Sequence, residues 1–325
     1  MRPSQRSLAT VLLLCFVVWF GKRLATPAQE IYQLSRWHNG VAWASAAPFP
    51  ASSSSLKASA TSIRQPSITD LTPSQYEGAE PPISNRPSTV ETTEVDRVIV
   101  VGKMKDDDTD WVVNELTDWL HAIYAVDDPE APLHVTKNKG NEANVYLQYI
   151  IDNYNDLPST IVFLHSHRDG YPRAWHTEFS DHSNVRAVQM LQTDFVQRNG
   201  YVNLRCNHNP GCPDEIRPFR AEKNEDHVPE QVFPEVWETF FNNTNVPEII
   251  ATPCCAQFAV SRAQVLQRSL RSYMLYHQWI MDTELPSDVS GRVMEYMWHI
   301  IFGQDPIYCP DMIQCYEDVY GILDI

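Results

Sequence analysis

The chain has 325 residues, enough for one large domain or two small ones. Apolar residues make up 43% and aromatic residues 11% of it, so a sizeable hydrophobic core can form. The formal net charge is −16 and no stripe of Lys and Arg stands out. Because such a chain repels a phosphate backbone, we expect no nucleic-acid partner.

The N-terminus is typical of a membrane signal. A basic tail over residues 1–7 precedes an apolar segment over residues 8–21, which is shorter than the about 20 residues of a full span. Lys22 and Arg23 follow directly, so no small-residue cleavage site is adjacent. This favours an uncleaved signal-anchor over a cleaved signal peptide. The expected membrane contact is therefore made by this anchor.

Residues 22–96 are rich in Ser, Pro, Ala and Thr. Such a segment buries too little apolar area to offset its ordering entropy, so it predicts a disordered stem. The folded part is then a lumenal domain over residues 97–325. This layout predicts a single-pass type II membrane protein of the ER or Golgi, with secretion as the alternative.

The domain begins with the apolar run "RVIVVGKM" from Arg97, which predicts a strand covered on both faces. Three carboxylates follow, Asp106, Asp107 and Asp108. They precede apolar residues at helical spacing between Asp110 and Ile123, so a helix is expected there. One carboxylate suffices to cap this helix, and the others are candidates to bind a ribose or a metal ion.

A second helix is predicted from Asn141 to Asn155, and the segment "KGNE" at its start is a weak candidate for holding phosphate. The strand that follows, "TIVFLH", runs directly into two histidines. His165 and His167 lie on one side of an extended backbone, because the side-chain period of a strand is two.

Two imidazoles so placed can share a metal ion, with Asp169 or His176 as a third ligand. A substrate-binding role without metal and a purely structural role are the alternatives. If a cation is bound, we expect manganese or magnesium ahead of zinc.

Six cysteines of the lumenal part predict three disulfides, since an even set in an oxidising compartment tends to pair. The sequence leaves the pairing open, although the adjacent pair is expected to bond elsewhere rather than to itself. Zinc held by Cys206, His208 and Cys212 is the rival interpretation. The six are Cys206, Cys212, Cys254, Cys255, Cys309 and Cys315.

The C-terminal half predicts further regular elements. Asn242 begins an N-glycosylation sequon, which fits a lumenal surface. Helices are expected over residues 234–242, 263–282 and 288–302, and strands at "EIIATP" and "AQFAVS".

Glu295 and His299 are four residues apart and would share one helix face. A carboxylate among apolar neighbours can act as a general base, so Glu295 is the catalytic candidate and His299 a substrate-binding one. A simple helix-stabilising pair is the alternative.

This order of elements predicts an α/β fold, a mostly parallel central sheet flanked by helices in a Rossmann-like sandwich. Ligands of such sheets bind outside the carboxyl ends of the strands. The Asp106 and His165 clusters both follow strands, and the helix with Glu295 should cover the same edge. The sequence therefore predicts one concave pocket containing all three.

The segments "VIVVGKMKDDDTDWV", "NKGNEANVYLQYIIDNYNDLPSTIVFLHSH", "CCAQFAVSR" and "SGRVMEYMWHIIFG" together resemble a fungal family known as domain of unknown function 3431. The likeness spans about residues 98–303 and implies the domain but no activity. A weaker resemblance is to nucleotide-sugar glycosyltransferases of the GT-A type. "IVFLHSH" is similar to the strand that carries their D-x-D metal motif, with histidines in place of the aspartates.

The leading functional hypothesis is a lumenal transferase that uses a nucleotide-sugar donor and a small-molecule or glycan acceptor. A metal-dependent hydrolase or tailoring enzyme of a fungal glycan or secondary metabolite is one alternative, and a non-catalytic carbohydrate-binding or scaffold module is another. The motifs G-x-S-x-G, H-E-x-x-H, the Walker loop and G-x-G-x-x-G are absent from the sequence. Their absence argues against α/β-hydrolases, zincins, P-loop enzymes and simple dehydrogenases.

Overall fold

The computed structural model describes residues 96–222 and 227–323. The predicted tail and signal-anchor, and the predicted stem except for Asp96, lie outside these ranges. Within them, no helix is long and apolar enough to span a membrane.

A mixed sheet of five strands forms the centre of the described chain, in the order β2-β1-β3-β5-β4. β1 is parallel to both of its neighbours, and β5 is antiparallel to both of its own. The α/β prediction is confirmed, with β5 as the strand that runs the other way. The strands are β1 (Arg97–Lys103), β2 (Leu120–Ala125), β3 (Thr160–Leu164), β4 (Tyr201–Asn203) and β5 (Phe258–Ser261).

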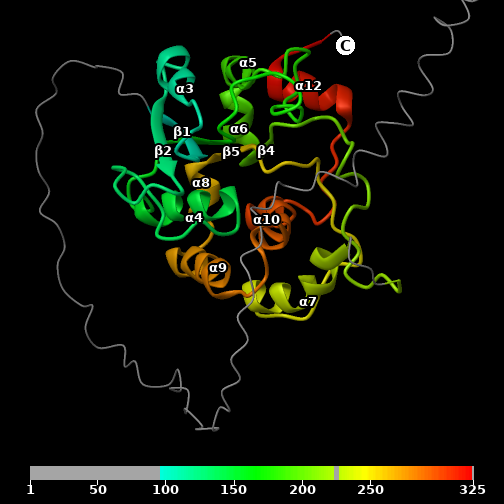
Figure 1. Cartoon of the computed structure of the whole chain (residues 1–325). Coiled ribbons are helices and arrows are strands. Elements are labelled where there is room, and N and C mark those ends of the chain that lie inside the picture. Colours follow the sequence, from blue (N-terminus) through cyan, green and yellow to red (C-terminus); the bar gives the residue numbers. More distant parts are fainter. Residues whose placement is uncertain (1–95, 223–226, 324–325) are drawn as a thin grey trace, which may run out of the picture. The chain divides into compact units, whose positions relative to one another are not determined.

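Helices cover both faces of this sheet (Figure 1). Val98 and Val100 of β1 belong to one core cluster, and Ile99 and Val101 to the other, because strand side chains alternate between faces. One layer contains α4 (Glu142–Asp152), α7 (Val228–Phe241), α8 (Arg262–Val265), α9 (Leu270–Asp282), α10 (Ser287–Glu295) and α11 (Trp298–Ile301). The other contains α3 (Asp110–Glu115), α5 (Asn184–Met190), α6 (Thr193–Asn199) and α12 (Met312–Tyr320).

Five predicted elements differ from the structure, and the first is the helix expected over residues 234–242, which begins at Val228 as α7. The helix expected from Asp110 to Ile123 ends at Glu115, and its second half is β2. The segment "EIIATP" contributes isolated bridges through Ile250 and Ala251 in place of a strand. The helix over residues 263–282 is divided into α8 and α9, since the Ser269 side chain accepts the Ser272 N–H and starts a new helix. The helix over residues 288–302 is divided into α10 and α11.

Three disulfides form, as predicted, and their pairing corrects one expectation. Cys206 bonds Cys315 and Cys212 bonds Cys309, so two bonds join the same two segments of chain. The third bond joins the adjacent Cys254 and Cys255, so the prediction that these two pair elsewhere is wrong. The backbone accommodates it with a positive φ of 90° at Cys255, a conformation that side chains rarely adopt.

These bonds also decide between disulfides and the rival zinc interpretation. Cys206 and Cys212 both carry their sulfurs in disulfides, so neither offers a thiolate, and His208 Nε2 lies 2.7 Å from the Pro310 carbonyl oxygen. Asn242 is exposed at the C-terminal end of α7, where its φ is 51°. That position is open to a glycan, and glycosylation there stays a prediction.

Candidate functional site

The carboxyl ends of β1 and β3 meet at one edge of the sheet. Val101 of β1 is in register with Leu164 of β3, and beyond this pair the Ser166 hydroxyl donates to Asp107 Oδ2 at 2.9 Å. The same Asp107 oxygen accepts the Met104 N–H at 3.0 Å. The structure therefore joins the aspartate and histidine segments at the point where we expected a site.

The three aspartates have different surroundings. Asp107 is half-buried and turned toward β3, whereas Asp106 and Asp108 are exposed. Asp108 Oδ1 accepts the Asp110 N–H at 3.0 Å and so helps to start α3. Only Asp107 has a contact with the β3 segment; Asp106, which we expected in the shared pocket, does not have one among the described contacts.

The His165 ring is buried, although the residue follows the end of β3. Its N–H donates to Gln257 Oε1 at 2.9 Å, and its ring centroid is 4.6 Å from that of His176. Burial lowers the pKa of His165 to about 4; the nearby His167 also lowers it, and a backbone hydrogen bond to Cys255 opposes the shift. The ring is therefore neutral at physiological pH, and its Nε2 is buried without a hydrogen-bond partner in the described chain.

The predicted metal ligands are not gathered around one point. Asp169 is exposed and ion-paired with Arg168, which also binds Glu115. Within the described ranges, the set of three or more potential ligand atoms lying within 4.8 Å of one another comprises Cys254, Cys255 and Glu295. Two of these are sulfurs of a disulfide, which are not thiolate ligands. The structure does not assemble His165, His167 and Asp169 into a ligand set.

Glu295, at the end of α10, contacts Cys255, whose backbone is also hydrogen-bonded to His165. Its Oε1 accepts the Cys255 N–H at 2.5 Å, and its Oε2 lies 3.1 Å from Arg292 Nη1. Arg292 also binds Glu215 at 2.5 Å. Through Cys255, whose backbone also bonds the His165 ring, the carboxylate joins the network that begins at β3.

His299 is not the partner of Glu295 that the spacing predicted. The two residues lie in separate helices, because α10 ends at Glu295 and α11 begins at Trp298. His299 is fully buried, with Nε2 3.0 Å from the Pro306 carbonyl oxygen. This hydrogen bond holds the chain that follows α11, and the buried ring is not exposed to a substrate.

Glu142, at the first turn of α4, is a carboxyl group whose importance the sequence did not reveal. Burial raises its pKa to about 8; a backbone hydrogen bond opposes this shift and the charge of Glu295 adds to it. The edge thus holds two carboxyl groups with different surroundings. One keeps its proton near neutral pH, and the other is held by a guanidinium and a backbone N–H.

The raised pKa of Glu142 predicts how stability changes with pH. Between pH 4.5 and about 8 the unfolded chain loses this proton while the folded chain keeps it, so folding stability falls as pH rises through that window. Because the residue is partly exposed, we expect Glu142→Gln to be about 2 kcal/mol more stable than the wild type at pH 8.5 and equal to it at pH 4. Chemical denaturation at both pH values measures the difference. A constant difference across this range would contradict the assignment.

Arg205 is a further buried polar group that sequence reasoning missed. It follows β4, and its guanidinium donates to the carbonyl oxygens of His176 at 2.8 Å and Asn209 at 2.7 Å. The available signal was a polar residue directly after the strand-like segment "YVNL", as His165 follows "TIVFL".

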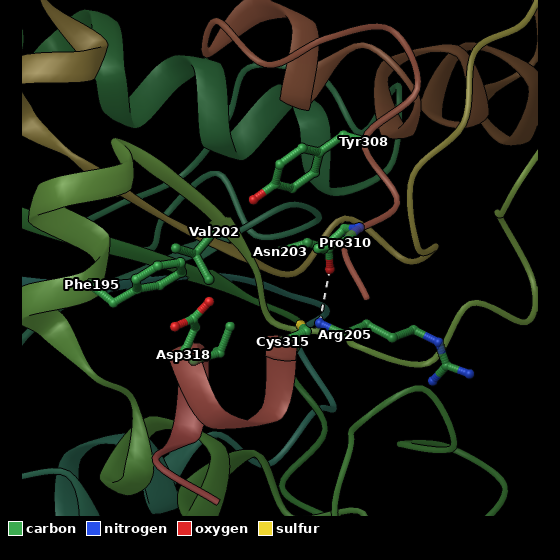
Figure 2. A pocket seen from close by; sticks show the side chains of 9 residues that line it. Phe195, Val202, Asn203, Arg205, Tyr308, Pro310, Cys315 and Asp318 are labelled. Atoms are coloured by element: carbon green, nitrogen blue, oxygen red, sulfur yellow. Dashed lines mark hydrogen bonds between the residues drawn. The ribbon is translucent and has the colours of Figure 1, made fainter. Parts of the chain in front are cut away.

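One cavity is lined in part by Arg205, and a second is lined by Lys103 and Lys105, which precede Asp107 in the chain. The first is lined from α6, β4 and the C-terminal segment, and Figure 2 shows the Arg205 side chain extending away from it. The second lies over the edge strand β2 and is lined by Lys103, Lys105, His121 and apolar side chains that include Val113 and Ile123. Neither cavity contains His165, His167, Asp106 and Glu295 together, so the predicted common pocket is not among them.

A comparison with protein families finds a match over most of the described chain. The family model described as "Protein of unknown function (DUF3431)" matches residues 99–318. No curated protein and no solved structure matches the chain. The resemblance to GT-A type glycosyltransferases is not supported by these comparisons.

Proposed function

The chain belongs to this family of proteins of unknown function, DUF3431, and from that premise we propose that it is a glycosyl-transfer enzyme acting at the carboxyl ends of β1 and β3. The donor is a nucleotide sugar and the acceptor is a hydroxyl group of a glycan or small molecule. The compartment is the oxidising lumen of the secretory pathway, in keeping with three disulfides.

The topology of the sheet supports this location. From β1 the chain passes to β2 on one side, and β3 then pairs on the other side of β1. In open α/β sheets ligands bind where the connections diverge in this way. That point lies between β1 and β3, where Asp107 and Ser166 are hydrogen-bonded.

The observation that carries the proposal is the pair of carboxyl groups at this edge. Glu142 has a pKa raised to about 8, and Glu295 accepts hydrogen bonds from Cys255 N–H and Arg292. A carboxyl group that keeps its proton near neutral pH can donate it, and a neighbouring carboxyl group held by a guanidinium can accept one, so this pair suits acid–base chemistry.

In the proposed reaction the oxygen of the acceptor hydroxyl attacks the anomeric carbon, and Glu295 takes the proton of that hydroxyl. The bond from that carbon to the donor's phosphate oxygen breaks, and the electron pair leaves with the nucleoside diphosphate. In this proposal Glu142 gives its proton to the diphosphate oxygen that leaves.

The cavity over β2 has the charge that the donor's phosphates require. Lys103 and Lys105 line it, and both belong to the segment that leads from β1 to Asp107. Asp128 also lines it and lies 3.5 Å from Lys105 Nζ, which leaves Lys103 as the cation for the phosphates. Apolar side chains beside the lysines suit the flat face of a nucleobase. Asp107 adds a carboxylate suited to a manganese or magnesium ion between protein and phosphates.

Thermal-shift measurements on the full-length chain test the donor directly. We expect one nucleotide sugar to raise the melting temperature, with an added stability of about 2.7 kcal/mol at a ligand concentration of 100 Kd. Parallel series with and without Mn²⁺ test the metal, and Lys103→Ala should reduce the shift. No shift with any nucleotide sugar, together with no transfer product, would rule out the proposal.

The same measurements separate the two alternatives. Tightly bound zinc or iron in the isolated protein, without nucleotide affinity, would indicate a metal-dependent hydrolase or tailoring enzyme. Binding of glycans without any turnover would indicate a carbohydrate-binding module.

A further inference from the structure

The segment directly before β5 connects several parts of the candidate site. The Cys255 N–H donates to Glu295 of α10, and the Cys255 backbone is also hydrogen-bonded to the His165 ring. Gln257 Oε1 accepts the His165 N–H at 2.9 Å, and Gln257 Nε2 donates to Asn184 Oδ1 at 3.1 Å. A change in the backbone of this segment therefore reaches both the proposed catalytic carboxylate and the end of β3.

The disulfide in this segment joins two adjacent residues, Cys254 and Cys255. Cys255 has a φ of 90°, and Ala256 follows with a φ of 50°. Residues with a Cβ disfavour positive φ, because the Cβ crowds a neighbouring carbonyl oxygen. The angle φ also sets the direction of the residue's own N–H. The bond between the two sulfurs thus keeps Cys255 in the conformation in which its N–H meets Glu295.

The two sulfurs of this bond differ in their access to solvent. Cys254 is 1% exposed, whereas Cys255 is half-buried. Exchange begins when an external thiolate attacks the sulfur that it can reach, so the attack falls on Cys255 Sγ. A mixed disulfide forms there, the bond between the two cysteines breaks, and Cys254 Sγ leaves and takes a proton.

A dithiol completes this reaction. Its second sulfur, as the thiolate, attacks the mixed disulfide, and Cys255 Sγ leaves and takes a proton in turn. The dithiol is oxidised to a cyclic disulfide, and its two hydrogens are balanced by those that the two cysteines gain. With the bond open, Cys255 can return to a negative φ, which turns its N–H away from Glu295.

The other two disulfides are less suited to this exchange. Both sulfurs of Cys206–Cys315 belong to buried residues. Cys212 and Cys309 are half-buried, but the intact bond Cys206–Cys315 keeps their two segments side by side. Their thiols would therefore stay neighbours and form the bond again. The adjacent pair differs, because its thiols separate when the backbone between them turns.

Glu295 is the group that responds to the opening. Its ligand oxygen lies within 4.8 Å of both sulfurs of the adjacent pair. In the disulfide form two donors hold its carboxylate, the Cys255 N–H at 2.5 Å and Arg292 Nη1 at 3.1 Å. Among these two, only Arg292 remains when the backbone turns, and its side chain is shared with Glu215. The carboxylate is then free to leave its position.

We propose that Cys254 and Cys255 form a thiol–disulfide exchange site, at which a dithiol releases Glu295 from the Cys255 N–H. Cys255 is thus a positioning residue for Glu295. The exchange and the release follow from the geometry of the segment. Their effect on glycosyl transfer rests on the proposed function.

The first test is the order in which the disulfides open. The folded full-length chain is incubated with graded dithiothreitol, quenched with acid, alkylated in denaturant and analysed by mass spectrometry. We expect Cys254 and Cys255 to be alkylated at dithiothreitol concentrations about tenfold lower than those that open the other two bonds. Opening of either other bond first, or of all three together, would overturn the proposal.

The second test is hydrogen exchange at the Cys255 amide, which is protected while Glu295 accepts it. Exchange should become about tenfold faster in the dithiol form, with the melting temperature nearly unchanged, because the bond closes almost no loop. The double variant Cys254→Ser, Cys255→Ser is the matched control. It should exchange at the fast rate both with and without dithiothreitol. Equal protection in both forms of the wild type would show that the N–H is not released.

The third test connects the exchange to catalysis. Reduction should lower kcat about tenfold and leave the KM of the donor unchanged, since Glu295 loses one donor and the donor's binding residues lie elsewhere. The residual rate of Glu295→Gln should not fall further on reduction. A further fall in that variant would place the effect at another site and remove Cys255 as a positioning residue.

The three tests also separate this inference from the proposed function. If the adjacent pair opens first and the amide is released, but no donor supports transfer, the exchange site stands and the glycosyl-transfer proposal fails. If transfer occurs at the same rate in both forms, the glycosyl-transfer proposal stands and the positioning role of Cys255 fails.

Discussion

Replacement of Glu295 by glutamine should lower the rate of glycosyl transfer by about 10²–10⁴-fold, the usual contribution of a general base. The amide has the shape of the carboxylate, and its oxygen can still accept the Cys255 N–H that Glu295 Oε1 accepts at 2.5 Å. What it lacks is the ability to take a proton from the acceptor hydroxyl. Steady-state kinetics should therefore show the loss in kcat, with the melting temperature nearly unchanged.

Glu215→Gln is the matched control for this variant. Arg292 binds both Glu215 and Glu295, so each substitution removes one ion-pair partner of the same guanidinium. Only Glu295 also contacts Cys255 and lies beside Glu142. Equal losses in the two variants would mean that the ion-pair network, and not proton transfer, supports activity. Full activity of Glu295→Gln would remove Glu295 from the mechanism.

Local sequence patterns predicted the elements whose surroundings are uniform. β1 and β3 are continuous apolar runs because both of their faces are covered, and α4 has its apolar residues at helical spacing. β2 was misread because Trp119, Leu120 and Ile123 also fit a helical spacing, and a short window cannot separate the two periods.

The sequence predicted where in the fold the candidate site lies, but not which residues contact each other there. A strand that ends on polar residues locates His165 and the aspartates at one edge of the sheet. Which of three aspartates turns inward depends on the turn after β1, where Asp107 accepts the Met104 N–H. Glu142 and Arg205 are ordinary charged residues in the sequence, and only the tertiary fold buries them.

The disulfide pairing could not be predicted from the sequence either, because it too depends on the tertiary fold. Cys206 and Cys212 have the spacing of a local loop, as have Cys309 and Cys315. The fold brings the two segments side by side, and the bonds cross between them. Cys254 and Cys255 bond to each other because the backbone at Cys255 adopts a positive φ.

Removal of both disulfides that join the two segments, Cys206–Cys315 and Cys212–Cys309, should destabilise the protein by about 7–8 kcal/mol. Removal of either one alone should cost about 3 kcal/mol. The two bonds close loops with separations of 109 and 97 residues, one inside the other. When Cys212–Cys309 is intact, the bond Cys206–Cys315 closes only the 12 residues by which these separations differ. Without it, the same bond closes the whole long loop, which restricts the unfolded chain far more.

Equilibrium denaturation of alanine variants measures this coupling. Each pair is replaced singly, and then both pairs together. Cys254→Ala with Cys255→Ala is the control, because a separation of 1 residue closes almost no loop and should change the unfolding free energy by about 1 kcal/mol or less. If the unfolding free energies lost in the two single variants add up to the loss in the double variant, the nested arrangement does not determine stability. Such additivity would mean that each bond acts through native contacts of its own and not through the chain that both enclose.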